Sequence, residues 1–257
     1  MKYYIADAFT DKIFSGNPAG VCILDSELPA EAMQKIAFEN NLSETAFVRR
    51  TGDVFSLRWF TPGFEIDLCG HATLAAAHIV MEQLERDMET VRFETVSGEI
   101  AVSRKDGLYE MSFPLRKPKK IEVTERISAA LGFAPREIYS DRDLYAVMDS
   151  EAQVKSYVPD YEKLSSLDEW MGIAVTAKGE SCDFVSRFFC PELKLEDPVT
   201  GSSHSSLVPL WSEKTGKKEF TAKQLSRRGG TLFCKLCDNS VMISGRAALY
   251  LEGEILL

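Results

Sequence analysis

The sequence lacks the features that would place the protein at a membrane or on a nucleic acid. No apolar run approaches the roughly 20 residues of a membrane-spanning helix, and Met1 to Asp7 contain no apolar signal core. Basic residues are not in excess, because 30 Lys and Arg against 39 Asp and Glu give a net charge of −9. Such an acidic chain rarely presents the basic face that binds nucleic acid. We therefore expect a cytoplasmic protein whose partner is neither a membrane nor a nucleic acid.

Cysteine and metal-binding motifs are also scarce. The six cysteines are scattered, mostly among apolar residues, which is the pattern of reduced thiols rather than of a disulfide framework. There is no Gly-rich phosphate-binding loop and no HExxH motif. Cys234 and Cys237 form a CxxC, but a zinc site needs two more ligands and none of the three histidines is near them in the sequence. We interpret this pair as structural thiols and expect no metal.

The sequence does contain one helix that is apolar on every side. From His71 to Leu84, Ala, Leu and Met dominate, and the first three turns carry no Asp, Glu, Lys or Arg. Because no face of such a helix suits water, we expect it to be buried. Cys69 and Gly70 precede it, so its start directs polar N–H groups and a partial positive charge at a neighbour. A small anion such as a substrate carboxylate is the usual occupant.

A similar unit recurs half a chain later. Each copy has an aromatic strand, a loop, a glycine and a helix of small residues, and this spacing indicates two similar domains rather than a solenoid. A charged stretch with a proline at 115–120 predicts the linker. We expect an α+β protein with domains at 1–116 and 121–257, each a mostly antiparallel sheet around one buried helix; the last residues can return to the first domain. The matched pairs are Arg58 and Arg187, Phe60 and Phe189, and Pro62 and Pro191, each 129 residues apart, with Gly70 and Gly201 131 apart.

Local patterns in the second half predict further elements. Tyr161 to Trp170 is typical of an amphipathic helix, and Val154 of a strand. Thr221 to Leu225 fits either a short helical turn or a strand. We expect the helix after Gly201 to break or kink near Pro209, because proline removes a backbone hydrogen bond.

Two titratable residues of the first half are candidates for proton transfer. Glu44 follows a predicted helix over 29–39 and stands where a strand begins. It is either a plain surface or capping residue, or a partly desolvated carboxyl group suited to moving protons near neutral pH. His71 stands at a helix N-terminus, where the dipole favours neutral imidazole, and it could exchange a proton or be a core residue. His78 lies on nearly the same helix face and is interpreted as structural.

The run from Glu196 to His204, Glu-Asp-Pro-Val-Thr-Gly-Ser-Ser-His, carries the other candidates. The amides of Gly201 and Ser202 could bind an anion, and Asp197 could share a proton with it. A capped helix start, with Asp or Thr as N-cap, is the structural alternative. Serine, histidine and aspartate could also mimic a hydrolase triad, but the chain has no Gly-x-Ser-x-Gly elbow.

Six motifs run in order from the N-terminus into the second helix of small residues. They are Asp7-Ala8-Phe9-Thr10, Phe14-x-Gly16-Asn17-Pro18-Ala19-Gly20-Val21, Leu42-Ser43-Glu44-Thr45-Ala46-Phe47, Phe60-Thr61-Pro62, Cys69-Gly70-His71-Ala72-Thr73 and Glu196-Asp197-Pro198-Val199-Thr200-Gly201-Ser202. Together they resemble the phenazine-biosynthesis PhzF-like isomerase family. The resemblance implies a fold like that of diaminopimelate epimerase, with the active site in a cleft between two similar domains. It also implies a cofactor-independent isomerase of a small carboxylic acid, often a homodimer.

The same resemblance assigns roles to individual residues. Glu44 matches the family's catalytic acid/base, which moves a proton across one face of an unsaturated carboxylic acid, and His71 and Asp197 match its assisting residues. By the same resemblance, we expect four residues to bind the substrate: Gly70, Gly201, Ser202 and Asn17.

The chain also departs from the family pattern, and other functions stay open. Related epimerases and racemases use a cysteine on each side of the cleft, whereas here Cys69 fits one place and Thr200 fills the other. Glu192 stands where the family often has glycine, and Ser203 where it more often has alanine, so the sequence leaves the substrate open. The alternatives are an amino-acid racemase or epimerase with a second base opposite Cys69, and a non-catalytic protein that binds a small carboxylate.

Overall fold

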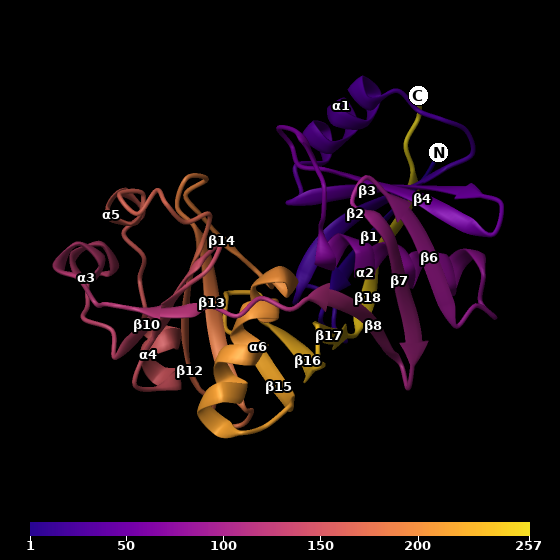
Figure 1. The fold of residues 1–257 in the computed structure, drawn as a ribbon. Helices are drawn as coiled ribbons and strands as arrows, with labels where there is room; N and C mark the ends of the chain where they lie inside the picture. The colour runs from indigo at the N-terminus through magenta and orange to yellow at the C-terminus, as the bar shows by residue number, and fades with distance from the viewer. The chain divides into compact units, whose positions relative to one another are not determined.

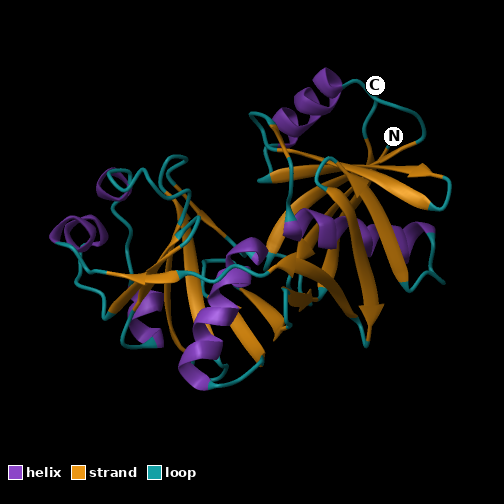
Figure 2. Ribbon diagram, in the orientation of Figure 1, coloured by secondary structure: helices purple, strands orange, loops and turns teal.

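The computed structural model describes residues 1–257 and consists of two compact units. Unit 1 comprises Met1–Ser112 and Ser244–Leu257, and unit 2 comprises Phe113–Ile243. Strands dominate both units and helices are few (Figure 1, Figure 2), so the expected α+β class is confirmed. No helix has both the length and the apolar character needed to cross a membrane.

Unit 1 is a sheet with strand order β18-β1-β2-β3-β4-β6-β7-β8, and β5 pairs with the end of β4. The pairs β2–β3 and β4–β6 are parallel, and the others are antiparallel. Helix α2 packs against β1, β2, β3 and β18, as Figure 1 illustrates. The strands are β1 Lys2–Ala8, β2 Asn17–Leu24, β3 Glu44–Thr51, β4 Val54–Phe60, β5 Glu65–Ile66, β6 Thr90–Thr95, β7 Gly98–Lys105, β8 Leu108–Pro114 and β18 Ala247–Glu254; the helices are α1 Ala30–Asn40, α2 Gly70–Ile79 and the π-helix η1 Val80–Leu84.

The central helix of unit 1 has the character that its sequence predicts. Every residue of α2 except His78 is buried. Alanines fill its middle, so strands on several sides can approach its backbone closely. The apolar character ends in η1, where Glu82 accepts hydrogen bonds from Arg104 (2.8 Å) and Tyr109 (3.1 Å). The predicted burial of this helix is therefore confirmed.

Unit 2 is a sheet with strand order β9-β10-β11-β12-β13-β15-β16, and β14 pairs with the end of β13. The pairs β11–β12 and β13–β15 are parallel. Helix α6 packs against β16. The strands are β9 Lys119–Ile121, β10 Glu137–Ser140, β11 Leu144–Val147, β12 Ile173–Lys178, β13 Phe184–Cys190, β14 Leu195–Asp197, β15 Glu219–Gln224, β16 Gly230–Leu236 and β17 Ser240–Gly245, the last at the unit boundary; the helices are α3 Glu125–Leu131, α4 Glu151–Ser156, α5 Tyr161–Leu164 and α6 Gly201–Thr215.

The sequence repeat corresponds to a repeat of structure. In each unit an aromatic strand (β4 or β13) pairs antiparallel with a very short strand (β5 or β14), and a buried helix follows. The strand after that helix then pairs in parallel with the aromatic strand. The repeated arginines make equivalent contacts. Arg58 donates two hydrogen bonds of 2.7 and 2.8 Å to Glu65, and Arg187 donates two of 2.7 and 2.9 Å to Glu196.

Two local predictions in unit 2 are wrong. The helix expected from Tyr161 to Trp170 is the short α5. After Leu164 the amides of Ser166 and Leu167 donate to the carbonyls three residues before them, at 3.0 Å each, so tighter turns replace the α-helical pattern. Val154 lies in helix α4 rather than in a strand, since Ser150 caps that helix by accepting from the amide of Gln153. The ambiguous residues from Thr221 on form strand β15.

The expected break at Pro209 is absent. Helix α6 continues through it from Gly201 to Thr215. The carbonyl that a residue at position 209 would normally engage belongs to Ser205. That carbonyl accepts instead from the amide of Arg116 at 3.3 Å, so the proline leaves no buried acceptor unpaired.

Candidate active site

The chain delivers Glu44 to the first position of strand β3. Helix α1 ends at Asn40, and its C-cap Asn41 has a left-handed conformation (φ 49°) that reverses the chain. Three residues later β3 begins, with Glu44 opposite Ala19 of the parallel strand β2. Thr45, the next residue, is fully buried, and the Glu44 side chain is only 17% exposed. Its carboxylate is thus largely withdrawn from water.

His71 brings an imidazole to that carboxylate. It is the second residue of α2, and its Nε2 lies 3.0 Å from Oε2 of Glu44. Its other ring nitrogen, Nδ1, lies 3.5 Å from Sγ of Cys69, the residue before the helix. The start of α2 therefore gathers a carboxylate, an imidazole and a thiol.

The facing atoms of Glu44 and His71 are close but not hydrogen-bonded. Oε2 of Glu44 and Nε2 of His71 are both buried, and neither makes a hydrogen bond of acceptable geometry although 3.0 Å separates them. Most buried polar atoms have a partner. These two atoms have only their ion-pair contact with each other, so the pair can still accept a hydrogen bond or charge from a bound molecule.

The contacts of His71 with Cys69 and Glu44 oppose the effects of burial and of the helix dipole on its charge. Burial by itself lowers the pKa of His71, but its contacts with Cys69 and Glu44 outweigh burial and raise that pKa well above the ordinary value. Burial, reinforced by the Glu44 carboxylate, also raises the pKa of the Cys69 thiol, so at neutral pH the thiol keeps its proton. The contacts with Cys69 and Glu44 therefore favour the protonated form of His71. The helix dipole, which favours neutral imidazole, is thus opposed by contacts that the sequence does not reveal.

The remaining predicted residues of unit 1 lie on the same two elements or beside them. Gly70 is the first residue of α2 and is buried. Asn17 is the first residue of β2 and is fully buried. His78 lies two turns along α2, where its Nδ1 is 2.9 Å from the Tyr109 hydroxyl.

A second cluster surrounds the start of α6 in unit 2. Asp197 ends β14, and the hydroxyl of Thr200, the N-cap residue of α6, donates to its carboxylate. Gln224 of β15, only 1% exposed, fixes both residues. Its Nε2 donates to the Asp197 carbonyl (2.7 Å) and to Thr200 Oγ1 (3.2 Å), and its Oε1 accepts from the Thr200 amide (2.9 Å). No motif singled out Gln224, because a glutamine in a short strand has no distinctive pattern.

The helix start itself also carries a cation that the sequence did not indicate. Gly201 and Ser202 are the first two residues of α6. Arg142 donates from Nη2 to Ser202 Oγ at 3.3 Å and to the buried carboxylate of Asp143 at 2.9 Å. Only the tertiary fold reveals this contact, since 60 residues separate Arg142 from Ser202.

His204 is a core residue rather than a member of a hydrolase triad. Its ring is fully buried and stacks on Phe184 with centroids 5.8 Å apart. Nδ1 lies 2.8 Å from the Thr200 carbonyl, and Nε2 has no hydrogen-bond partner, so no serine hydroxyl engages the ring. Burial lowers the pKa of His204 to about 4.

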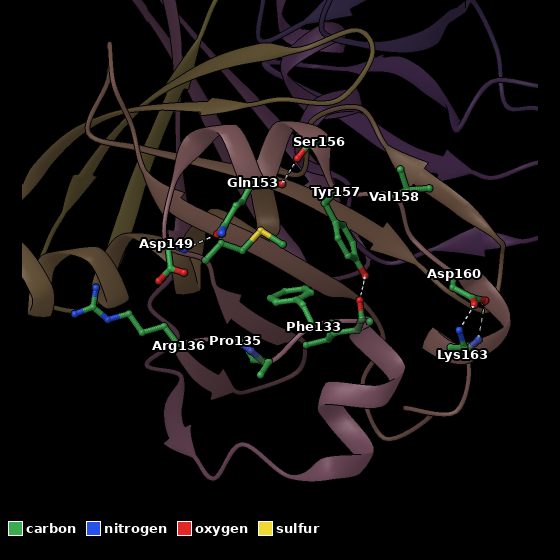
Figure 3. A pocket seen from close by; sticks show the side chains of 14 residues that line it. Phe133, Pro135, Arg136, Asp149, Gln153, Ser156, Tyr157, Val158, Asp160 and Lys163 are labelled. Carbon is green, nitrogen blue, oxygen red and sulfur yellow. Dashed lines mark hydrogen bonds and ion pairs between the residues drawn. The ribbon is translucent and has the colours of Figure 1, made fainter.

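Unit 2 also has a cavity that is separate from these residues. It measures about 560 Å³ and lies beside α3, α4 and α5. Figure 3 shows Tyr157, whose hydroxyl donates to the Leu131 carbonyl, and the ion pair of Lys163 with Asp160 at its edge. None of the candidate residues lines it.

Comparison with known proteins gives one consistent answer. Residues 6–253 match the family described as phenazine biosynthesis-like protein. An uncharacterized isomerase of Pseudomonas aeruginosa is 45% identical, over 100% of this chain and 99% of that protein. The crystal structure of a PhzF-family phenazine biosynthesis protein from Enterococcus faecalis has a TM-score of 0.97 at 46% identity and covers 100% of this chain and 99% of that one. A probable proline racemase from Agrobacterium radiobacter K84 has a TM-score of 0.68 at 11% identity, covering 100% of this chain and 93% of that one, which shows a likeness of fold alone.

Proposed function

Because the chain belongs to the phenazine biosynthesis-like (PhzF) family, we propose that it is an isomerase that moves a proton within a small unsaturated or amino carboxylic acid. Glu44 is the general acid/base of this proposal. The observation that carries it is the buried Glu44–His71 pair at the start of α2, whose facing atoms make no hydrogen bond. The name isomerase, given to relatives of this chain, supports it.

The reaction needs one group that can both take and return a proton. The Glu44 carboxylate removes a proton from a carbon next to a conjugated double bond. The electrons of that C–H bond form a new double bond, and the displaced electrons move along the conjugated system. The protonated Glu44 then returns the proton at the far end of that system. Substrate and product have the same mass, and the step as written consumes no cofactor.

The surroundings of Glu44 suit this chemistry. A dienolate beside a carboxylate carries negative charge that must be stabilised, and fixed positive groups in a water-poor site do this best. His71, which its neighbours keep protonated, supplies one such group 3.0 Å from Glu44. The start of α2 at Gly70 supplies the partial positive charge of a helix N-terminus.

The proposal also includes contributions that rest on the family resemblance. Asp197 would assist proton transfer, and Gly70, Gly201, Ser202 and Asn17 would bind the substrate. A cytoplasmic homodimer is part of the same proposal. Light scattering coupled to gel filtration would test the dimer.

Metabolite profiling in D₂O tests the proposed reaction. Wild-type protein and Glu44→Gln are incubated with a cell extract, and mass spectrometry follows compounds that gain deuterium or change retention at constant mass. Glu39→Gln is the matched control, because Glu39 is an exposed glutamate at the end of α1. We expect a change that wild type and the control produce and Glu44→Gln does not. A folded Glu44→Gln that remains fully active would contradict the proposal, and binding of small acids without any change would favour a non-catalytic carboxylate-binding protein.

An amino-acid racemase is the second candidate, and buried Cys69 beside His71 is the observation in its favour. Such enzymes need a second base, and Thr200 occupies the matching position of unit 2 without an ionisable side chain. A thiol mechanism requires Cys69. Turnover that persists in Cys69→Ala would therefore discard it.

A further inference from the structure

The cluster at the start of α2 also has the composition of a transition-metal site. One ligand atom each from Glu44, Cys69 and His71 lie within 4.8 Å of one another. A carboxylate, a thiolate and an imidazole form a donor set that suits Zn²⁺, whereas Mg²⁺ and Ca²⁺ prefer oxygen ligands alone. We propose that these three residues bind one Zn²⁺ ion and that bound zinc inhibits the enzyme.

The spacing of the ligand atoms is close to what zinc requires. With bonds of about 2.0–2.3 Å, the ligands of a tetrahedral zinc ion lie about 3.3–3.8 Å apart. Here the carboxylate and imidazole atoms are 3.0 Å apart, and the thiol sulfur is 3.5 Å from the nearer ring nitrogen. A metal engages only one nitrogen of a ring, so at most about 1 Å of side-chain movement closes the set within the 4.8 Å limit.

The poor alignment of the Glu44–His71 ion pair supports a ligand at this position. Glu44 Oε2 and His71 Nε2 are buried and lack hydrogen-bond partners, and His71 is only 6% exposed. A cation between them would satisfy both atoms once the imidazole is neutral. Other residues shape the site around them: the Thr73 hydroxyl donates to the Cys69 carbonyl at 2.5 Å and fixes the backbone of the residue that carries the sulfur.

Binding follows a balanced exchange of protons for metal. The Cys69 thiol loses its proton to the solvent as the zinc–sulfur bond forms, and His71 gives up its extra proton as a ring nitrogen coordinates. No electrons are transferred. Three protein ligands leave the fourth position of the tetrahedron to water or to a carboxylate.

Inhibition rests on the proposed function. A carboxylate that coordinates zinc cannot take and return a substrate proton, so occupation of the site removes the general acid/base. Metal binding itself does not depend on that function. It can therefore be measured without a substrate.

Cobalt spectroscopy tests binding directly. Co²⁺ replaces Zn²⁺ in such sites and gives a thiolate-to-cobalt charge-transfer band in the near ultraviolet. We expect this band with one equivalent of Co²⁺ bound to the wild-type protein, and its disappearance when Zn²⁺ is added. Cys69→Ser should abolish the band, while circular dichroism checks that the variant is folded. Should Cys69→Ser not fold, Glu44→Gln provides a second variant, in which the band stays but shifts.

A control separates this site from the other cysteines. Cys237→Ser removes the accessible member of the CxxC pair, which is the competing thiol site. We expect Cys237→Ser to bind Zn²⁺ in calorimetry as the wild type does, and Cys69→Ser to bind at least about 10-fold more weakly, since even outer-shell changes cost 10- to 100-fold. Loss of binding in Cys237→Ser, or unchanged binding in Cys69→Ser, would overturn the proposal.

The inhibitory effect needs the substrate that D₂O profiling identifies. Each protein is compared with its own metal-free rate, and one equivalent of Zn²⁺ should stop the wild-type reaction reversibly, with recovery on adding a chelator. Full turnover with zinc bound would refute the inhibition and leave binding established. Failure to find any isomerase activity would count against the proposed function, while the cobalt band would still decide the metal site.

Discussion

Replacing Arg187 by methionine should destabilise the protein much more than replacing Arg58 by methionine, although each arginine donates two hydrogen bonds to a glutamate. Arg58 has a side chain that is 34% exposed, and Glu65 is 32% exposed. Arg187 is 11% exposed, and Glu196 is 20% exposed. Arg187 also donates to the carbonyls of Val154 (3.3 Å) and Tyr157 (2.5 Å), so it satisfies backbone acceptors that would otherwise be buried without a hydrogen-bond partner.

The expected magnitudes follow from this difference in burial. An exposed ion pair contributes about 0.2–1 kcal/mol. Removing one partner of a buried pair costs about 3–5 kcal/mol, because the other charge stays buried without compensation. We expect Arg58→Met to lower the free energy of unfolding by about 1 kcal/mol or less, and Arg187→Met by about 3 kcal/mol or more. The second variant should also loosen β14, which carries Asp197 next to Glu196.

Urea unfolding measures the two losses, and hydrogen exchange locates them. Trp59 lies in unit 1, and Trp170 and Trp211 lie in unit 2, so fluorescence reports on both units. Amide exchange in Arg187→Met should accelerate in β13 and β14. Double-mutant cycles with Glu65→Gln and Glu196→Gln isolate each pair. Equal losses in the two variants would refute the reasoning, because they would show that burial does not set the strength of this repeated contact.

Three further predictions concern pH and backbone geometry. Burial lowers the pKa of His204 to about 4, below its ordinary 6.5. The stability that depends on its neutral form should therefore be present above pH 6.5 and fall by about 1 kcal/mol per pH unit as the pH drops towards 4. An NMR titration of the ring with a midpoint above 6 would contradict this prediction. Hydrogen bonds from Lys214 and Tyr139 lower the pKa of Glu137 to about 2. The contribution of ionised Glu137 to stability should therefore be complete above pH 4.5 and disappear towards pH 2. Acid unfolding of Lys214→Met should begin at higher pH than that of wild type. Gly16→Ala should lower the free energy of unfolding by about 1–3 kcal/mol more than Gly52→Ala does. Both glycines have positive φ (66° and 73°), but only at Gly16 does an added Cβ meet a backbone atom, the Ala8 carbonyl oxygen at 2.1 Å. Equal thermal unfolding of the two variants would exclude that clash.

The parts of the fold that the sequence predicts are those set by strong patterns. The absence of charge between His71 and Met81 leaves burial as the only option for α2, and the repeated Arg, Phe and Pro mark equivalent strands. The failures occur where local propensity competes with tertiary contacts. At Pro209 the loss of a hydrogen bond is offset by the amide of Arg116, which is distant in the sequence.

For the candidate site, the sequence supplies a set of residues but not their contacts. Motif order singles out Glu44, His71 and Asp197, but it carries no information on which side chains meet. For His71 the sequence shows only the dipole of its own helix, which favours neutral imidazole, whereas Glu44 comes from strand β3 and is seen only in the fold. Gln224 contacts Asp197 and Arg142 contacts Ser202, and these partners are 27 and 60 residues apart in the sequence, so no local pattern marks either contact.

The return of β18 to the first sheet affects how a newly synthesised chain can fold. β18 pairs along the whole length of β1, and Met1 and Ile255 exchange backbone hydrogen bonds of 3.2 and 2.9 Å. On the ribosome β1 is made before unit 2, and β18 is made after it. Until β18 emerges, β1 keeps an unpaired edge that can bind other strands. All of unit 2 can therefore be synthesised and folded while unit 1 still lacks its last strand. This order is the reverse of the usual one, in which N-terminal domains fold first.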